Sequence, residues 1–319
     1  MRQLIAVAGW AAATLLVLLV AGRLLPTWAV FLATIAFAKG MVALGQVTLM
    51  RGGLASFGQG LFYCAGAYAA GLLAKATGIS DAFALCGAGA LLGLLLGLLV
   101  GPLVASYRGI FFATLTLALS MIAYGALNKI YFLGGSDGIN LRPPTFFGYS
   151  PEGDAQSYAL FAFAAVAAVL AGGFCRLYFS SMRGLLSLAI RDNELRVEYL
   201  GASVRAASLS NFTIAATLGG IGGAVAGMAL GHIEPEYAFW TTSGEFVFLA
   251  ILSGHVSVAA VFLASIALEL VRSFSSQYFP NSWQMALGIF LLLVILFLPQ
   301  GLGSLLRWRR RPVARGPVA

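Results

Sequence analysis

Long apolar runs recur along the whole chain and limit what it can fold into. A run of about 18 or more residues is long enough to cross a hydrocarbon core about 30 Å thick. Only 9% of the 319 residues are charged, whereas soluble domains carry roughly 25%. A chain with so little charge cannot cover a normal solvated surface. The sequence therefore predicts an all-α polytopic membrane protein, a multi-pass bundle of transmembrane helices.

The runs between charged and turn residues define ten expected spans. The short run at 245–256 cannot cross alone, so we expect a half-helix or broken segment there. The first run follows the basic Arg2, but it is longer than the apolar core of a signal peptide and lacks a small-residue cleavage site. We therefore expect an uncleaved first span rather than a leader. The expected spans are 4–25, 28–50, 54–75, 82–105, 109–133, 158–179, 207–231, 245–256, 257–273 and 283–300.

The positive charges favour one orientation, because Lys and Arg are enriched in cytoplasmic loops. If Arg2 faces the cytoplasm, 13 of the 19 basic residues lie on that side, including the tail RWRRR. Both termini are then expected in the cytoplasm. We interpret the net charge of +8 as membrane topology and attraction to anionic lipid, and not as nucleic-acid binding. The three cysteines fall in spans and suggest neither disulfides nor a metal site.

Two ladders of glycines recur at four-residue intervals within expected spans. This spacing places each ladder on one helix face, where a second backbone can approach closely. Helix packing is the favoured interpretation, and a smooth face lining a pathway is the alternative. The first ladder is Gly89, Gly93, Gly97 and Gly101, and the second is Gly219, Gly223, Gly227 and Gly231.

The segment LASFGQGLFYCAGAYAAGLL is too polar for a lipid-facing helix, since it carries Ser56, Gln59, Tyr63 and Tyr68. Polar membrane segments persist where protein or a water-filled cavity surrounds them. We expect a central element beside a translocation path, with an interior packing helix as the alternative.

Lys39 lies near the middle of its expected span, where a charge is costly unless it pairs, reaches the interface or faces water. A cavity-facing role, a neutral or carbonyl-bonded lysine and a misplaced span boundary all remain open. Glu269 is the one serious candidate for an intramembrane carboxylate. A local ion pair with Arg272, three residues further on, explains it most simply.

The motifs of common enzyme classes are missing from the sequence. None of the three lysines has the Gly-Lys-Ser/Thr context of a phosphate-binding loop. His232 and His255 lack metal-ligand partners at standard spacing. The sequence therefore argues against an ATPase site, a metal site and an intramembrane enzyme.

Charge is concentrated in the stretch LAIRDNELRVEYLG, residues 188–201. Asp192 and Arg196 form an acid-before-base pair at i, i+4 that supports a helix, and Gly201 is a natural C-terminal stop. We expect a short amphipathic helix that serves as a docking surface; a merely solvated loop is the alternative. The apolar residues expected to share its face are Leu188, Leu195 and Tyr199.

This stretch resembles the cytoplasmic loop of ABC-transporter permeases of the branched-chain amino-acid type, specifically the second of their two permease subunits. The family pattern is close to A-I-R-E-N-E-x-R-A-E-x-L-G, and here Asp192 replaces a Glu and Val197 an Ala. In such permeases the loop contains the coupling helix that docks on the ATPase subunit. The resemblance implies this role for Arg191, Asp192, Asn193, Glu194, Arg196, Glu198 and Gly201.

The resemblance extends over roughly residues 30–303. The stretches GGLASFGQGLFYCAGAY, YRGIFFATLTLA, GGSDGI and LFLPQGL are similar to family motifs and occur in the family's order. Two features depart from the pattern. SGHVSVAAV, Ser253 to Val261, stands where the family has a glycine-rich turn, and Lys39 replaces a small or apolar residue.

The resemblance implies a permease subunit without chemistry of its own. Its expected regions are an N-terminal membrane span at 1–27, a permease transmembrane domain at 28–303 with the coupling loop at 180–208, and a basic cytoplasmic tail at 304–319. The expected location is the bacterial cytoplasmic (inner) membrane.

The implied partners are a homologous permease, two ATP-binding cassette subunits and a periplasmic or extracellular solute-binding protein. The ATPase partners would use ATP, and this chain would bind no cofactor. The expected cargo is a branched-chain or other hydrophobic amino acid, with urea, short amides and aromatic acids left open. A stand-alone secondary carrier is the rival interpretation.

Overall fold

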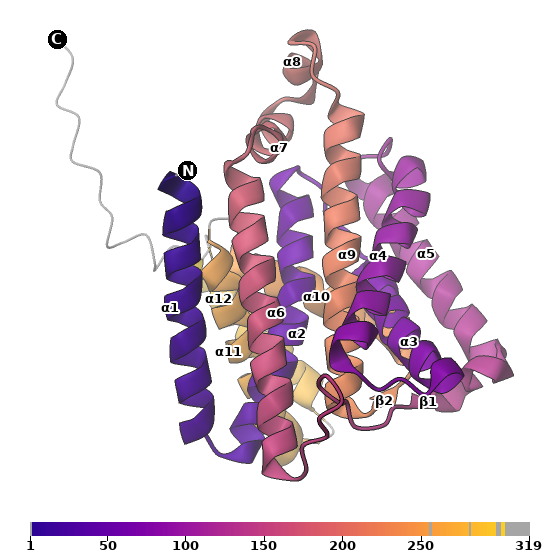
Figure 1. Cartoon of the computed structure of the whole chain (residues 1–319). Coiled ribbons are helices and arrows are strands. Elements are labelled where there is room, and N and C mark those ends of the chain that lie inside the picture. The colour runs from indigo at the N-terminus through magenta and orange to yellow at the C-terminus, as the bar shows by residue number, and fades with distance from the viewer. Residues whose placement is uncertain (1, 255–256, 281, 298–300, 304–319) are drawn as a thin grey trace.

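The chain folds into a bundle of helices, as the computed structural model shows (Figure 1). The structure describes residues 2–254, 257–280, 282–297 and 301–303, so the expected basic tail and part of the departing Ser253–Val261 segment lie outside the described residues. The helices are α1 (Arg2–Leu24), α2 (Thr27–Arg51), α3 (Gln59–Thr77), α4 (Ala82–Val104), α5 (Gly109–Lys129), α6 (Asp154–Ser180), α7 (Met182–Asp192), α8 (Glu194–Tyr199), α9 (Val204–Leu230), α10 (Trp240–Ser253), α11 (Val258–Tyr278) and α12 (Trp283–Phe297).

Within the described residues, seven helices are long and apolar enough to cross a membrane: α1, α2, α4, α5, α6, α9 and α11. They coincide with seven of the expected spans and confirm a polytopic helical bundle. The other three expected spans correspond to α3, α10 and α12. Helix α10 has 14 residues, or about 21 Å at 1.5 Å per residue, which is too short to cross alone. The total of ten crossings stays a prediction.

Helix α9 is the central helix of the bundle and packs against α2, α3 and α4. Helix α1 lies at the edge against α6, and large apolar side chains such as Trp10 and Leu16 are exposed on it. In a chain with these apolar spans, such side chains face lipid. The buried core of the bundle therefore surrounds α9, and α1 lies at the periphery.

The first glycine ladder lies on the face of α4 that contacts α9. A Cβ added at Gly93 would lie 2.5 Å from the carbonyl oxygen of Ala216, and one at Gly97 would lie 2.9 Å from the Ala216 Cβ. One at Gly89 would lie 2.7 Å from the Gly220 carbonyl oxygen, and Gly101 faces the Leu209 side chain. Only glycine allows the two backbones to approach this closely.

The second ladder, on α9, faces α3 along most of its length. A Cβ added at Gly223 would collide with the carbonyl of Tyr63, and one at Gly219 would lie 2.8 Å from the Phe62 Cβ. Gly227 contacts Ile233. Gly231 is different: it ends α9 with a φ of 68°, and its carbonyl oxygen accepts from the backbone N–H of Leu141, which lies outside the helices, at 2.8 Å. The prediction that Gly231 packs against a helix was wrong, because the residue is a left-handed helix cap.

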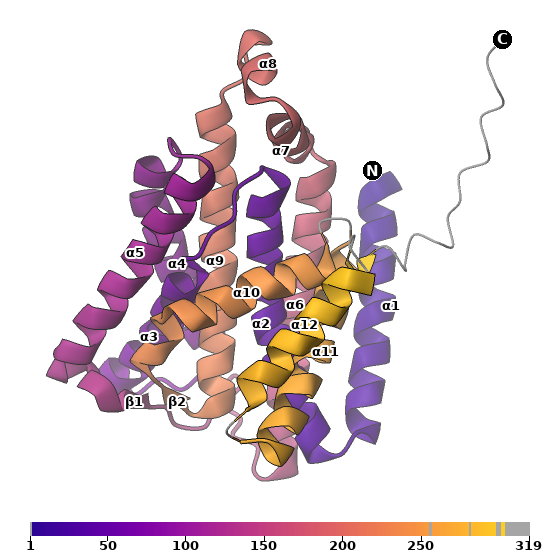
Figure 2. The ribbon, with the colours of Figure 1, turned by 180° about the vertical axis from the view of Figure 1, so that it is seen from behind.

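The start of the expected span at 54–75 is not helical. After α2 ends at Arg51, residues 52–58 descend into the bundle as irregular chain, and α3 begins only at Gln59 (Figure 2). The backbone N–H of Phe57 donates to Thr116 Oγ1 at 3.1 Å, and that of Gly60 donates to Ser243 Oγ at 3.0 Å. These side-chain acceptors satisfy backbone groups that lipid would leave without a partner.

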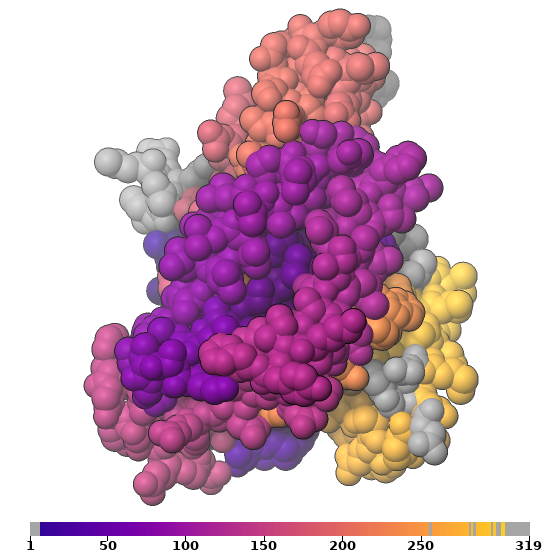
Figure 3. All heavy atoms as spheres, turned by 90° about the vertical axis from the view of Figure 1, so that its right-hand side faces the viewer, coloured from indigo at the N-terminus to yellow at the C-terminus, as the bar shows by residue number. Residues whose placement is uncertain are grey.

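The two ends of the bundle differ in structure. At one end the strands β1 (Ile139–Asn140) and β2 (His232–Ile233) pair antiparallel, next to the one-turn helix η3 (Pro235–Ala238). At the other end α7 and α8 project beyond the bundle, with the start of α9 beside them (Figures 1 and 3). Helix α10 runs obliquely across the back of the bundle (Figure 2).

Candidate functional site

The charged stretch at 188–201 forms parts of two helices, not one. Helix α7 ends at Asp192, and Asn193 has φ −160° and ψ 103°, which no helical residue adopts. The side chain of Asn193 then caps α8, because its Oδ1 accepts from the backbone N–H of Arg196 at 2.9 Å. Asparagine is among the residues preferred at such N-cap positions. The prediction of one continuous amphipathic helix was wrong, and the pair expected between Asp192 and Arg196 spans the break.

Helix α8 ends at Tyr199, and Gly201, the predicted stop, lies just beyond its C-cap residue Leu200. The Gly201 φ of 82° is left-handed. The N–H of Gly201 donates to Glu198 and that of Ala202 to the carbonyl of Val197, the two bonds of a Schellman motif. The expected apolar face is mostly exposed: Leu195 is 65% and Tyr199 89% accessible. These side chains are therefore available to a partner.

The α7–α8 region is firmly attached to the bundle. Ile190 and Val197 pack with Val204 and Ala207 of α9 in a small apolar cluster of their own. The buried Asn211 of α9 joins three helices through polar contacts. Its Oδ1 accepts from the Tyr178 hydroxyl at 2.6 Å, and its Nδ2 donates to Ser187 Oγ at 2.9 Å. A force on α7 would thus reach α6 and α9 directly.

The charged side chains of the coupling-loop candidates fall into two groups. Glu194 accepts from Arg108 Nε, which lies between α4 and α5. Arg191 is exposed and lies against Gly53 at the end of α2. The candidates exposed on the surface are Arg191, Asp192, Asn193, Arg196, Glu198 and Gly201. An external partner would meet this group, while Glu194 is engaged within the chain.

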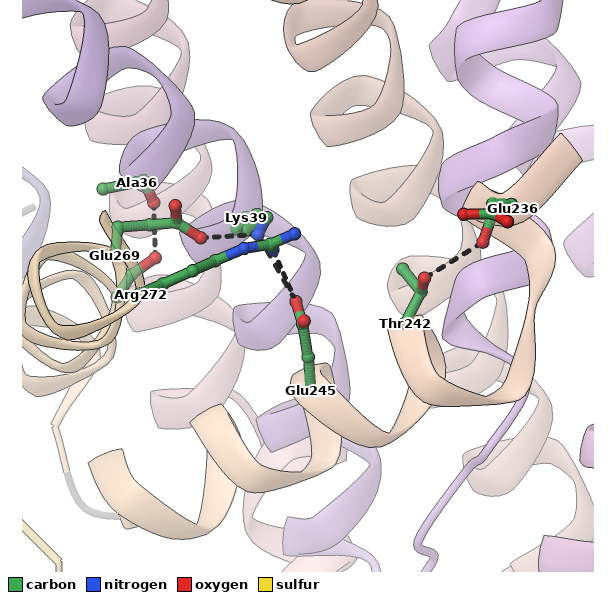
Figure 4. Close-up of polar contacts among 8 residues, drawn as sticks. Ala36, Lys39, Glu236, Thr242, Glu245, Glu269 and Arg272 are labelled. Carbon is green, nitrogen blue, oxygen red and sulfur yellow. Dashed lines mark hydrogen bonds and ion pairs between the residues drawn. The ribbon is translucent and has the colours of Figure 1, made fainter. Parts of the chain in front are cut away.

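A cluster of opposite charges lies inside the bundle (Figure 4). Lys39 of α2 is 7% exposed. Its Nζ lies 2.5 Å from Glu269 Oε1 on α11 and 3.4 Å from Glu245 Oε2 on α10. Arg272 Nη1 of α11 lies 3.0 Å from the same Glu245 oxygen. Buried charges are stable only when paired and hydrogen-bonded in this way.

The cluster answers the question that Lys39 raised. The residue lies well inside α2, so the span boundary was correctly placed, and its partners are carboxylates rather than carbonyls. The local interpretation of Glu269 missed this cross-helix partner. Glu245 was also missed, because it falls at the start of the expected half-helix. The unexplained charge of Lys39 was the signal, since an acidic partner is one of the few ways to stabilise an intramembrane lysine.

The other path candidates lie in the interior in this conformation. Ser56, Gln59, Tyr63 and Tyr68 are all buried. Ser56 Oγ accepts from the N–H of Gly58, and the Tyr63 ring packs on Tyr237 and Phe246. Among the residues that the structure describes, the amide of Gln59 and the hydroxyl of Tyr68 have no hydrogen-bond partner. Such unsatisfied buried groups are rare in folded proteins.

The charge cluster borders a cavity of about 1100 Å³ between α10, α11 and α12. Glu245 and Arg272 reach its wall, whereas Lys39 and Glu269 lie behind them. Most of the remaining wall is apolar. The lining residues from α12 are Leu287, Gly288, Leu291, Leu292 and Leu296.

Comparison with known proteins gives a consistent picture. A family described as "Branched-chain amino acid transport system / permease component" matches residues 27–298. The "High-affinity branched-chain amino acid transport system permease protein LivM" of Escherichia coli (strain K12) is 29% identical over 279 residues, and its counterpart in Salmonella typhimurium (strain LT2) is 28% identical. Each alignment covers 81% of this chain but only 65% of the relative's length. No solved structure matches this chain significantly.

Proposed function

Because the chain belongs to the branched-chain amino acid transport permease family, we propose that it is the membrane-spanning subunit of an ATP-driven importer for branched-chain amino acids. The observation that carries the proposal is the extent of the family match, which includes every helix from α2 to α12. The match therefore includes both the α7–α8 region and the charge cluster.

In this proposal, α7 and α8 transmit motion from the ATPase. Their exposed charges and apolar side chains project beyond the bundle, and their inner faces are tied to α6 and α9 through Asn211. ATP-driven closure of the motor would push α7–α8 and rock the bundle between inward-open and outward-open states. A motor shifts such an equilibrium only through contacts that differ between the two states.

The proposed topology has ten crossings, with both termini in the cytoplasm of a bacterial inner membrane. The arrangement of charge supports it, because Arg51, Arg108 and Arg205 come at the same end of the bundle as α7–α8. Cytoplasmic ends of membrane proteins are rich in Lys and Arg. Helices α3, α10 and α12 would contribute partial or oblique crossings.

The proposed assembly contains a sister permease, two ATP-binding cassette subunits and an external solute-binding protein. ATP would be bound and hydrolysed by the cassette subunits, and this chain would bind no cofactor. Urea, short amides and aromatic acids remain the alternative cargoes for the same architecture.

A stand-alone secondary carrier is the second candidate, and the buried carboxylates of Glu245 and Glu269 are the observation that favours it. Ion-coupled carriers use intramembrane carboxylates as proton or sodium sites. Here each carboxylate is paired with a cation, Lys39 or Arg272. The pairing favours a structural or substrate-binding role over ion coupling.

Affinity copurification from native membranes tests the proposal. We expect an ATPase and a second permease to copurify with the wild-type chain. The double reversal Asp192→Arg with Glu198→Arg should lose the ATPase selectively, because both side chains are exposed on α7–α8. The matched control is Glu152→Arg, an exposed acid in the loop before α6, which should retain both partners. Recovery of the chain alone, with uptake that persists without ATPases, would move the assignment to a stand-alone carrier.

A further inference from the structure

The cavity between α10, α11 and α12 combines mostly apolar walls with the ion-paired Glu245 and Arg272. Its volume of about 1100 Å³ is sufficient for a small solute with accompanying water, since ligand pockets usually measure about 300–1,000 Å³. Leucine side chains from α12 form one side, and Phe248 of α10 contributes to another. Entering such a cavity would therefore cost little free energy for a solute with an apolar body.

The ion pair presents one carboxylate and one guanidinium to the cavity. Glu245 is 19% and Arg272 35% exposed, and they pair with each other at 3.0 Å. Lys39 and Glu269, whose side chains are 8% and 10% exposed, lie behind them. Because Lys39 also contacts Glu245, Glu245 keeps a cationic partner when Arg272 turns toward a ligand. Lys39 is in turn held by Glu269.

We propose that this cavity binds an amino acid as its zwitterion, with Glu245 facing the ammonium group, Arg272 the carboxylate, and the α12 leucines the apolar side chain. The inference rests on the proposed transport function and adds the cargo site to it. The ligand would enter between the paired Glu245 and Arg272 and replace one ion pair by two.

Charge balance selects the ligand class. Lys39 and Arg272 supply two positive charges, and Glu245 and Glu269 supply two negative ones. A zwitterion leaves this balance unchanged, whereas an aromatic acid would add an anion that these four side chains do not compensate. Urea and short amides carry no charge and would form no ion pair with Glu245 or Arg272. Glu236 also reaches the cavity wall, but it lies beside Thr242 and apart from these four side chains (Figure 4).

Equilibrium binding of radiolabelled leucine tests the site on the purified full-length chain, with its copurifying permease and ATPase but without the solute-binding protein. The competitors are leucinamide, which lacks the carboxylate, and 4-methylpentanoate, which lacks the amine. We expect unlabelled leucine to displace the radiolabel, and neither leucinamide nor 4-methylpentanoate to do so. Glu245→Gln and Arg272→Gln should each weaken leucine binding at least tenfold, while the charge-retaining Glu245→Asp and Arg272→Lys should weaken it less.

Gly288 provides a test that leaves the charges intact. It lines the cavity, and a Cβ added there meets no atom of the described residues within 4 Å. Gly288→Phe should therefore fold and place a ring beside the α12 leucines, where the apolar side chain of the ligand would lie, and so weaken leucine binding, whereas Gly288→Ala should retain it. The matched control is Gly125→Phe, since Gly125 of α5 also has open space but lies outside the cavity.

The outcomes separate the site from the transport function. ATP-driven leucine uptake that is unchanged in Glu245→Gln, Arg272→Gln and Gly288→Phe would overturn the site and leave the function intact. Leucine binding that these variants weaken, in a chain without ATPase partners or ATP dependence, would support the site and reject the importer. If the charge variants fail to fold, the comparison of Gly288→Phe with Gly125→Phe decides.

Discussion

Arg108 and Glu194 are joined across 86 residues of sequence: Arg108 Nε donates to both carboxylate oxygens of Glu194, at 3.1 Å each. The guanidinium is itself fixed to the α4–α5 turn, because Nη1 donates to the carbonyl oxygens of Ala105 and Tyr107. This pair adds a third attachment to α7–α8, beyond those to α6 and α9. It links the projecting region to the helices on the far side of α9.

Reversing one charge of this pair should affect coupling more than stability. Both side chains are partly exposed, at 28% and 37%, and such pairs contribute about 0–1 kcal/mol to folding. We expect Arg108→Glu or Glu194→Arg to lower ATP-driven uptake about fivefold or more, with a small change in melting temperature. The combined exchange should restore uptake. Normal uptake in both single variants would show that this contact does not contribute to coupling.

Removing the charge of Lys39 should destabilise the bundle strongly. Lys39→Met removes the cation that contacts Glu269 directly, and breaking a buried pair costs about 3–5 kcal/mol. Thermal unfolding in detergent should show a large drop in melting temperature. The double variant Lys39→Met with Glu269→Gln should recover much of it, because Arg272 still pairs with Glu245. Equal destabilisation in the single and double variants would argue against the ion pair.

Adding a methyl group at Gly223 should separate α9 from α3. Its Cβ would collide with the backbone carbonyl of Tyr63, which cannot move without shifting α3. Gly223→Ala should cost about 1–3 kcal/mol or more, as overpacked cores do. Gly125→Ala is the control, since open space surrounds that position and alanine favours a helix by about 1 kcal/mol. Melting temperatures of the two variants give the comparison.

Truncating Asn211 should loosen α7 without unfolding the spans. Asn211→Ala deprives the Tyr178 hydroxyl and Ser187 of their partner, at a cost of about 1–3 kcal/mol for buried groups. Trypsin should then cleave faster after Arg191 and Arg196. Asn128→Ala is the control, because its amide donates only to a carbonyl one turn back in α5. Unchanged cleavage would mean that the apolar cluster alone holds α7.

Apolar length and glycine spacing predicted most of the fold. Both are local properties of one helix: a run of 20 apolar residues has few alternatives to a membrane helix, and Gly93 or Gly97 need only a close neighbour. The helix break at Asn193 was not predictable in the same way. Asp192 and Arg196 favour continuation, but Ile190 and Val197, on either side of the break, both pack with α9 in one apolar cluster.

The candidate site was harder to predict than the fold. Lys39 signalled a buried charge, but its partners lie 206 and 230 residues away in sequence. Only the arrangement of α2, α10 and α11 brings them together. Glu245, which reaches the cavity wall, follows an ordinary polar stretch and carries no local signal of burial.

The irregular segment at 52–58 constrains how the chain can be assembled during synthesis. The backbone N–H of Phe57 in this segment, and that of Gly60 in the adjoining first turn of α3, depend on the hydroxyls of Thr116 and Ser243, which follow 59 and 183 residues later. In hydrocarbon an unmatched N–H costs several kcal/mol. The segment therefore cannot take its final position as it leaves the ribosome. It can reach this position only after α10 has been synthesised. The placement of the segment and of the start of α3 is therefore one of the last steps of biogenesis.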